Sequence, residues 1–471
     1  SVAVGSSALA NQNSTTSADM FNVAVGNSAM QNNTTGANNT AVGKIALCVN
    51  TTGEDSVAVG GNSLDANTTG SYNNAVGRNS LTTNTTGTKN NAFGHSSLEL
   101  NTEGDNNVAI GHKSLEANTT ADNNTAIGFQ SLLANTTGSE SDALGSCALC
   151  SNTTGCRNVA IGKGAMLLNT EGECNVAVGH TALSAQTTGD CNTALGVKAL
   201  NTNTTASNNT AVGFKSLAAN TTGTSNTALG TNSLCANSTA SNNTAVGRDS
   251  LDANTTGDKN TAIGKGSLTR NTTAGCNTGV GVDTLLFTTT GTNNVAVGNL
   301  ALAFNTTGGN NVSVGVCALY DNTTAVGNTA VGTNSLCSNT TGFNNTAVGN
   351  CSGNDVTTGD CNTFIGASAA YQATTGSNNT AVGDQALSLT TTASDNTAVG
   401  RSALRSNTTG TNNVAVGKNA LTANTTANNN IAIGLDSLCV NQTGLKNVAM
   451  GTDTLRNNTG GCNTAIGYLS L

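Results

Sequence analysis

Residues 243–259 are NTAVGRDSLDANTTGDK, and this 17-residue unit recurs with small changes along the whole chain. We number the unit from its first alanine, so that Ala245 occupies position 1, Leu251 position 7 and Asn254 position 10. Position 1 is alanine in 25 of the 28 copies, and position 3 is glycine in all of them. A unit of this length is too short for a pair of helices, which needs about 33 residues, and it suits one coil of a β-solenoid.

The composition also favours a regular array over ordinary domains. The 471 residues include no proline and no tryptophan, and only 3% are aromatic and 9% charged. A globular domain needs more large apolar residues for its core, and a disordered chain usually carries more charge. The net charge of −8 and the lack of a basic patch argue against nucleic acid as a partner. No apolar run approaches the ~18 residues of a membrane span.

We therefore predict an all-β fold, a single continuous β-solenoid over residues 1–471, with about 28 coils and two short strands per coil. β-Branched residues at positions 17 and 2 favour a first strand over positions 16 to 2, with both side chains inward. A second strand is expected over positions 6–11, with the position-7 leucine inward. Glycine at position 3 predicts a turn with positive φ, and position 13 makes the second turn. At ~4.8 Å per coil the array would be roughly 130 Å long.

Charged residues gather at positions 4, 5, 8, 9, 14 and 15, which this scheme places in turns that face water. The exceptions are Glu103 and Glu171 at position 12 and Asp142 at position 17.

The alanine at position 1 leaves two interpretations open. It lies between two positions predicted to point inward, so it should point outward and could contact another chain. Alternatively, the coil is so thin that only alanine fits inside. Phe364 favours the second interpretation, because it coincides with Gly353 and Ala370 at position 7, where two leucines are missing.

Irregular spacing occurs only near the ends of the array. The first unit has 21 residues, with an insertion at 14–21, and the terminal coils over 449–471 include a unit of 16 residues. Neither end carries a polar cap, which solenoids normally need. We expect head-to-tail stacking of subunits, with candidate assembly joints at Ser1, Phe21, Cys462 and Leu471. A fragment of a longer array is the alternative.

Asparagines form N-x-T glycosylation motifs at two places in the unit. Position 10 gives Asn33, Asn50 and Asn67, where a ladder of side chains from coil to coil is the alternative to glycosylation. Position 15 lies on a predicted turn, where covalent glycans are more plausible, and it gives Asn38, Asn123 and Asn208.

Fourteen cysteines suggest an oxidising compartment. All lie near predicted turns, and three pairs are candidate disulfides. Stacked coils could bring together Cys174 with Cys191 and Cys337 with Cys351, and Cys147 with Cys150 could close a turn within one coil. The three histidines, His95, His112 and His180, all occupy position 4 and are expected on a solvated turn. We find no catalytic constellation, metal motif or cofactor motif, so an enzyme is not expected.

The NTAVG…SL…NTTG unit resembles the repeats of phage-type tail fibres and bacterial surface fibres. More distantly, it is similar to the head repeats of trimeric autotransporter adhesins, typically S-V-A-I-G-x-x-A. The resemblance covers the whole chain, and it implies an extracellular or cell- or virion-surface fibre or adhesin, often trimeric.

Three functions remain open at this point. The first is a structural subunit of an extracellular filament whose main partner is itself. The second is a surface adhesin or tail-fibre shaft that binds glycans. The third is ice binding, which the consecutive threonines at positions 11 and 12 disfavour because neighbours on a strand point to opposite faces.

Overall fold

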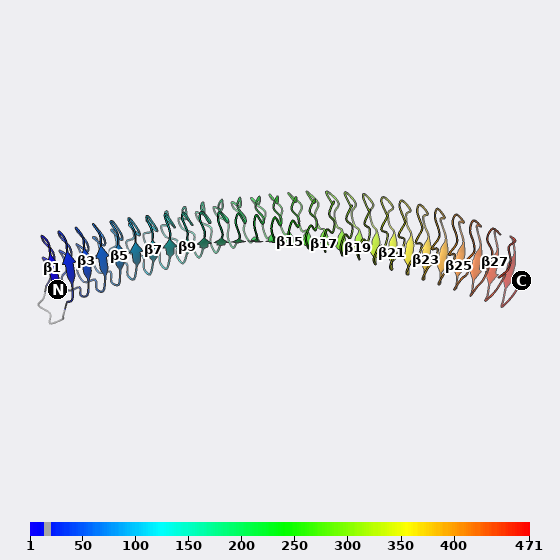
Figure 1. The fold of residues 1–471 in the computed structure, drawn as a ribbon, viewed down its shortest axis with the longest axis horizontal. Coiled ribbons are helices and arrows are strands. Elements are labelled where there is room, and N and C mark those ends of the chain that lie inside the picture. Colours follow the sequence, from blue (N-terminus) through cyan, green and yellow to red (C-terminus); the bar gives the residue numbers. More distant parts are fainter. Residues whose placement is uncertain (14–19) are drawn as a thin grey trace. The chain divides into compact units, whose positions relative to one another are not determined.

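In the computed structural model, which describes residues 1–13 and 20–471, the chain is a parallel β-solenoid with one coil per 17-residue unit (Figure 1). Two compact units, Ser1–Thr239 and Ala240–Leu471, divide it. The strands of the first unit are β1 Val2–Val4, β2 Val23–Val25, β3 Thr40–Val42, β4 Val57–Val59, β5 Asn74–Val76, β6 Asn91–Phe93, β7 Val108–Ile110, β8 Thr125–Ile127, β9 Asp142–Leu144, β10 Val159–Ile161, β11 Val176–Val178, β12 Thr193–Leu195, β13 Thr210–Val212 and β14 Thr227–Leu229. Those of the second unit are β15 Thr244–Val246, β16 Thr261–Ile263, β17 Thr278–Val280, β18 Val295–Val297, β19 Val312–Val314, β20 Thr329–Val331, β21 Thr346–Val348, β22 Thr363–Ile365, β23 Thr380–Val382, β24 Thr397–Val399, β25 Val414–Val416, β26 Ile431–Ile433, β27 Val448–Met450 and β28 Thr464–Ile466.

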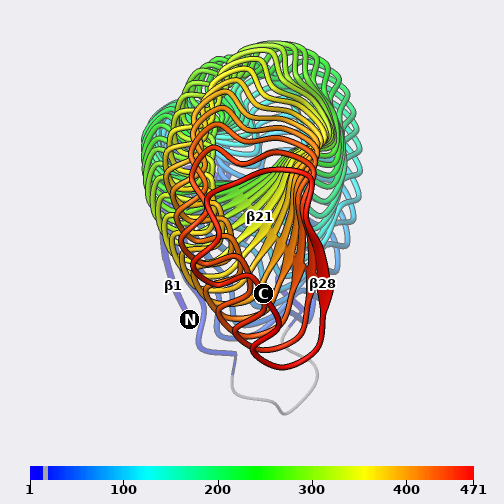
Figure 2. The ribbon, with the colours of Figure 1, turned by 90° about the vertical axis from the view of Figure 1, so that its right-hand side faces the viewer.

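Within each unit, every strand pairs in parallel with the next one along the chain, and like positions face each other. Ala58 of β4, for example, is aligned with Ala75 of β5. The backbone bonds continue outside the strands, since Leu64 N donates to Ser80 O at 3.0 Å and Thr68 N to Thr85 O at 3.0 Å. Seen end-on, the coils are stacked loops with the strand along one side (Figure 2). The predicted β-solenoid is thus confirmed.

The prediction of a second strand per coil is wrong. Positions 6–11 form turns, because the residues at positions 5 and 7 have positive φ, as in Asn62 at 58° and Leu64 at 51°. A strand needs φ near −120°, so these residues cannot extend the chain. The position-7 leucine nevertheless points inward as predicted, and Leu64 is fully buried.

The two faces of the strand are the reverse of the prediction. The position-1 alanine is inside, as in fully buried Ala58, while Val57 and Val59 on either side of it point outward. The interpretation of position 1 as an outward contact is therefore wrong, and the thin-coil interpretation is right. Gly279 illustrates how little room there is. A Cβ there would lie 2.6 Å from Ser267 Oγ and 2.9 Å from Thr284 Oγ1.

Phe364 is the one large side chain at position 1, and it is fully buried. It fills the space that the missing leucines leave, because a Cβ on Gly353 would lie 2.8 Å from Phe364 Cδ2 and 3.1 Å from Leu336 Cδ2. The compensation suggested by the sequence is therefore present. Together, Gly353, Phe364 and Ala370 keep the interior filled without the usual leucines.

The position-3 glycines form the predicted turn with positive φ. In Gly60 φ is 138°, and a Cβ would lie 2.5 Å from Gly77 O in the next coil. Backbone therefore packs on backbone along this column, and no side chain fits. The described charged residues also follow the prediction, since none of them is buried.

The irregular units lie at the two ends of the described chain. Most of the insertion at 14–21 falls outside the described residues, but Met20 is buried and Phe21 is exposed. At the other end, Ala449 of β27 is aligned with Ala465 of β28, so the 16-residue unit keeps the strand register.

Candidate functional sites along the coils

The asparagines at position 10 form a buried ladder. From Asn50 to Asn169, each side-chain Nδ2 donates to the position-10 Oδ1 of the preceding coil, in eight successive bonds of 2.7–3.0 Å that begin with Asn33 as acceptor. The same Nδ2 also donates to the position-13 carbonyl of its own coil, as from Asn50 to Gly53 O at 3.0 Å. These amides therefore add to the backbone bonds that link neighbouring coils on this side, where no second strand forms.

A second asparagine column at position 16 ties the turn to the strand. Asn39 Nδ2 donates to Gly53 O at 2.8 Å, and Asn39 Oδ1 accepts from Ser56 N at 2.9 Å. Sequence reasoning missed the role of this position. Its recurrence immediately before the strand was the available signal, because a buried amide needs partners that only a fixed geometry supplies.

The two classes of glycosylation motif differ in accessibility. Asn33, Asn50 and Asn67 are fully buried members of the position-10 ladder. In the folded chain these asparagines therefore form the ladder that was the alternative to glycosylation.

The position-15 candidates Asn38, Asn123 and Asn208 are all exposed, each with φ between 59° and 62°. They present their amides to solvent from a left-handed turn. If the folded chain carries N-linked glycans, this column is where the structure leaves room for them.

The predicted cysteine pairs are thiols, and no disulfide joins them in the described part of the chain. Cys174 and Cys191 are exposed at the same turn position of adjacent coils. Burial raises the pKa of Cys150 to about 11, and the neighbouring Cys147 adds to the effect. Burial likewise raises the pKa of Cys337 to about 11, with smaller contributions led by Asp321 and including Cys351. The thiols of Cys150 and Cys337 are therefore poor nucleophiles at neutral pH.

Ring side chains stack from coil to coil on the turns. The ring centroids of His95 and His112 are 5.2 Å apart, and Phe129 continues this stack at 5.7 Å from His112. A second stack joins Phe287 and Phe304 at 4.8 Å. Among the described residues, no group of three or more histidines, cysteines or carboxylates is placed to hold a metal ion.

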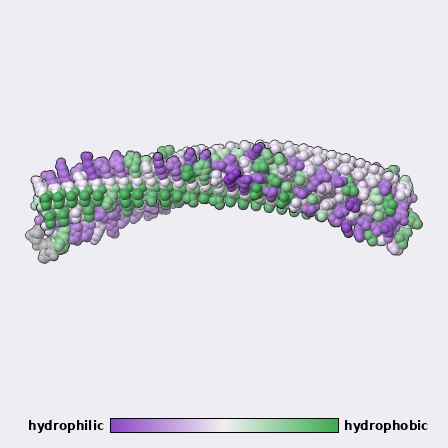
Figure 3. Space-filling view, viewed as in Figure 1, coloured by the Kyte–Doolittle hydropathy of each residue, from purple (hydrophilic) through white to green (hydrophobic). Residues whose placement is uncertain are grey.

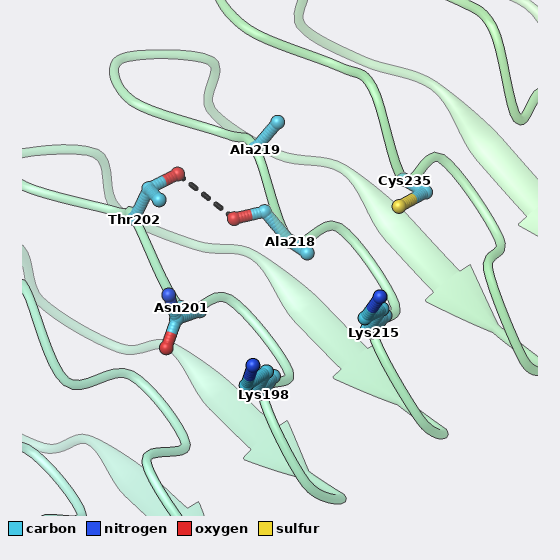
Figure 4. A pocket seen from close by; sticks show the side chains of 7 residues that line it. All are labelled: Lys198, Asn201, Thr202, Lys215, Ala218, Ala219 and Cys235. Carbon is cyan, nitrogen blue, oxygen red and sulfur yellow. Dashed lines mark hydrogen bonds between the residues drawn. The ribbon is translucent and has the colours of Figure 1, made fainter.

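A shallow groove of about 290 Å³ crosses the turns that follow strands β12 to β14 (Figure 4). Lys198 and Lys215 occupy position 5 of adjacent coils, and their side chains lie side by side along one rim. Small residues at positions 8 and 9, chiefly Ala218 and Ala219, leave the floor low. Sequence reasoning missed this groove, although two lysines 17 residues apart beside two alanines were visible in the repeat.

The polar groups of the groove favour an anion. Thr202 Oγ1 is committed to Ala218 O, to which it donates at 2.8 Å, while the two lysines bring like charges together. An anion between them would relieve their repulsion. Positions 4, 5, 8 and 9 of the coils that begin at β10 to β14 hold no carboxylate to do so. An anionic group such as a carboxylate or a sulfate would complement the charge of this groove.

Comparison with protein-family models and with curated proteins finds no match for the chain. The described residues contain no helix of the length and apolarity that crossing a membrane requires.

Proposed function

We propose that the chain is a structural subunit of an extracellular fibre, assembled head to tail through the open edges of its terminal coils. The observation that carries this proposal is the direction of the backbone bonding. In the strands and in the turns alike, backbone groups of each coil bond the coil before it and the coil after it, so coils add in one direction. Repeats of this kind supply length and stiffness rather than a catalytic pocket.

The terminal strands support end-to-end contact. Within residues 1–471, β1 pairs on one side with β2, and β28 pairs on one side with β27. In this stretch of chain Val4 of β1 is 57% exposed and Ile466 of β28 is 71% exposed. An open strand edge recruits another strand, and a head-to-tail contact that does not close produces a filament.

Electron microscopy of the purified chain tests this proposal. We expect fibres many times longer than one chain, and we expect Ile466→Lys to shorten them because it places a charge at the joint. Phe343→Lys, which changes an exposed turn residue away from both edges, is the control. Discrete single-chain rods at every protein concentration would contradict head-to-tail assembly.

A second function, adhesion to acidic glycans, is favoured by the groove at Lys198 and Lys215. The carboxylate or sulfate groups of a glycan would bind between the two ammonium groups, and the sugar would lie over Ala218 and Ala219. Neutral glycans would lack the charge contact that this site offers.

Binding to an array of acidic and neutral glycans tests the adhesin function. The double change Lys198→Ala and Lys215→Ala should weaken binding of acidic glycans about 5-fold or more, the scale of one or two exposed ion pairs. The control variant, Lys89→Ala with Lys259→Ala, removes the same total charge from position 15 of two other coils. It should leave binding unchanged. Equal losses in both double variants would instead indicate a general charge effect.

A further inference from the structure

The outward side of the strands is an exposed apolar surface. We call the side chains at positions 17 and 2 the outer strand face, because both point away from the interior in every coil. Position 2 is Val, Ile, Leu, Phe or Met in all 28 strands. These side chains remain open to solvent in the single chain, with Leu195 46%, Ile263 40% and Val348 37% exposed. Figure 3 shows this face as a green band over the strands labelled β1 to β9 in Figure 1.

The repeat contains its own test of why position 2 is apolar. Threonine matches valine in shape and also favours strands. It occupies position 17 in 14 of the 28 strands and position 2 in none. Strand propensity alone would have allowed threonine at both positions. The restriction at position 2 therefore concerns apolarity, which gains free energy only when the side chain leaves water.

Charge is also nearly absent from the outer strand face. Asp142 is the only charged residue among its 56 side chains, and the second unit has none. Exposed sheets of soluble proteins usually carry charges that prevent association with other sheets. This face lacks such protection along almost all of its strands, although charged residues occur on the turns beside it.

Each unit carries enough of the outer strand face to supply a large part of a protein interface. Fourteen strands about 4.8 Å apart, each with two outward residues spanning about 7 Å, give each unit a footprint of roughly 470 Å². That lies within the range of the largest apolar patches of monomeric proteins, about 300–600 Å², which are often functional. It is more than half of the ~800 Å² that each partner contributes to a stable complex.

We propose that the outer strand face binds the same face of a second copy of this chain. A partner for this surface must present an apolar group about every 4.8 Å over many strands, and a second copy does so because it has the same repeat. Two such sheets pack face to face about 10 Å apart, with the position-2 columns interdigitating. The contact is isologous and lateral, so it is independent of the head-to-tail contact proposed above.

Sedimentation and light scattering of the full chain test this proposal against a matched pair of variants in the second unit. Val297→Lys with Val348→Lys introduces charge on the outer strand face, where both valines are 37% exposed. Val282→Lys with Val316→Lys changes two valines at position 4, which are 42% and 45% exposed but lie on a turn. We expect lateral pairs in the wild type and in the turn variant. The outer-face variant should raise the dissociation constant at least ~100-fold, since it buries unpaired charge.

Two further measurements keep the outcome interpretable. Replacing the same outer-face valines with threonine preserves strand propensity, and it should weaken pairing by a smaller factor even if the lysine variant fails to fold. Electron microscopy separates the two contacts, because lateral pairing doubles the width of a rod and head-to-tail assembly extends its length. A wild-type chain whose rods have single width at every concentration, or equal losses in the outer-face and turn variants, would overturn the proposal.

Discussion

From Asn33 to Asn169 position 10 is an asparagine amide in every coil, whereas at Val356 and Ala373 the same position is apolar. All four of these side chains are buried. In the first region, bonds between amides hold one coil to the next. In the second region, Phe364 and the apolar residues around it fill the interior by volume. The same backbone path therefore accommodates two kinds of core.

The two kinds of core respond differently to interruption. Each amide needs a donor from the next coil, so a break leaves an acceptor without a partner. This happens at Asn169 Oδ1 before Gln186 and at Asn339 Oδ1 before Val356. The apolar region has no such requirement, because contacts between hydrocarbon groups are not directional. A large side chain in one coil can therefore fill space left by a small one in the next coil, but a missing hydrogen-bond donor cannot be replaced in this way.

The strongest test of the volume-based core is Phe364→Ala. The change should lower the free energy of local unfolding by about 3–5 kcal/mol, because it empties a fully buried phenyl site. Hydrogen exchange of the coils that begin at β21 and β22 would measure it. Phe343→Ala, at an exposed turn, is the control.

Restoring leucine at position 7 should recover most of that loss. Gly353→Leu and Ala370→Leu return the consensus residues, and Gly353 already has φ near that of the other position-7 residues, at 60°. Gly353→Leu alone should destabilise the protein because it collides with Phe364. If the effects of the three changes on stability are additive, the leucines do not fill the space that Phe364 leaves.

A smaller effect is expected for Asn101→Ala in the amide ladder. It removes donation to Asn84 Oδ1 at 2.8 Å and to Gly104 O at 3.0 Å, and it removes the acceptor for Asn118 Nδ2. We expect a loss of about 2–3 kcal/mol in local stability, because Asn84 Oδ1 remains buried and unpaired while Gly104 O keeps only the donor from Asn90. Hydrogen exchange should show faster opening in the adjacent coils as well. Asn27→Ala at an exposed turn should change little, within about 0.5 kcal/mol.

Extending the ladder into the apolar region would sharpen the comparison further. Val356→Asn alone should change stability by less than about 1 kcal/mol, because it supplies a donor to Asn339 but leaves its own acceptor unpaired. Adding Ala373→Asn and Thr390→Asn connects the ladder to Asn407. The free energy of unfolding of the triple variant, measured with denaturant, should exceed the value expected from the sum of the single changes by about 1–2 kcal/mol. A deficit instead would mean that Phe364 leaves no room for amides.

The smallest expected effects concern two thiols on turns, one within the first region and one next to the second. Cys150 lies beside the amide ladder and Cys337 lies one coil before the apolar region, and both have a pKa raised to about 11. Both should alkylate slowly at pH 8, faster as the pH approaches 11, and at similar rates. Exposed Cys174 is the reference in the same mass-spectrometric experiment. Different rates for Cys150 and Cys337 would show that the kind of core affects the turns.

The same two thiols give a small pH dependence of stability. Their pKa values are higher in the folded chain than the ordinary value of 9.0, so folding favours the protonated form. The associated stabilisation is complete below pH 9 and disappears as the pH rises through about 11. Replacing both cysteines with alanine should reduce the pH dependence of the denaturant midpoint between pH 9 and about pH 11. Buffer titration of the wild type and the variant provides the measurement.

The sequence predicted the period, the inward leucine and the position-3 turn because each has a single physical explanation. Strand alternation indicated that positions 17 and 2 share a face, but it could not tell which face, and the inward side proved to be the alanine. The second strand was predicted wrongly because nothing in the residue type of Leu64 signals a positive φ, although asparagine, as at Asn62, adopts one more readily than most residues. That conformation is imposed by the bonds of each coil to its neighbours.

The candidate sites were predictable to different degrees. The buried amide ladder was anticipated as an alternative at position 10, because a regular polar column inside a repeat needs partners. The groove at Lys198 and Lys215 was not found, since its residues are separated by one repeat and become neighbours only when the coils stack. The pairing of cysteines stays a prediction for an oxidising environment.

The bonding between residues one repeat apart also bears on how such a chain changes length. Among the described residues, the backbone bonds that leave a coil join it to the coil before it or the coil after it. Duplication or deletion of one 17-residue unit therefore gives every remaining coil a neighbour of the same kind. Recombination within the gene would adjust the reach of the protein in increments of about 4.8 Å. Its length is thus open to selection separately from its fold.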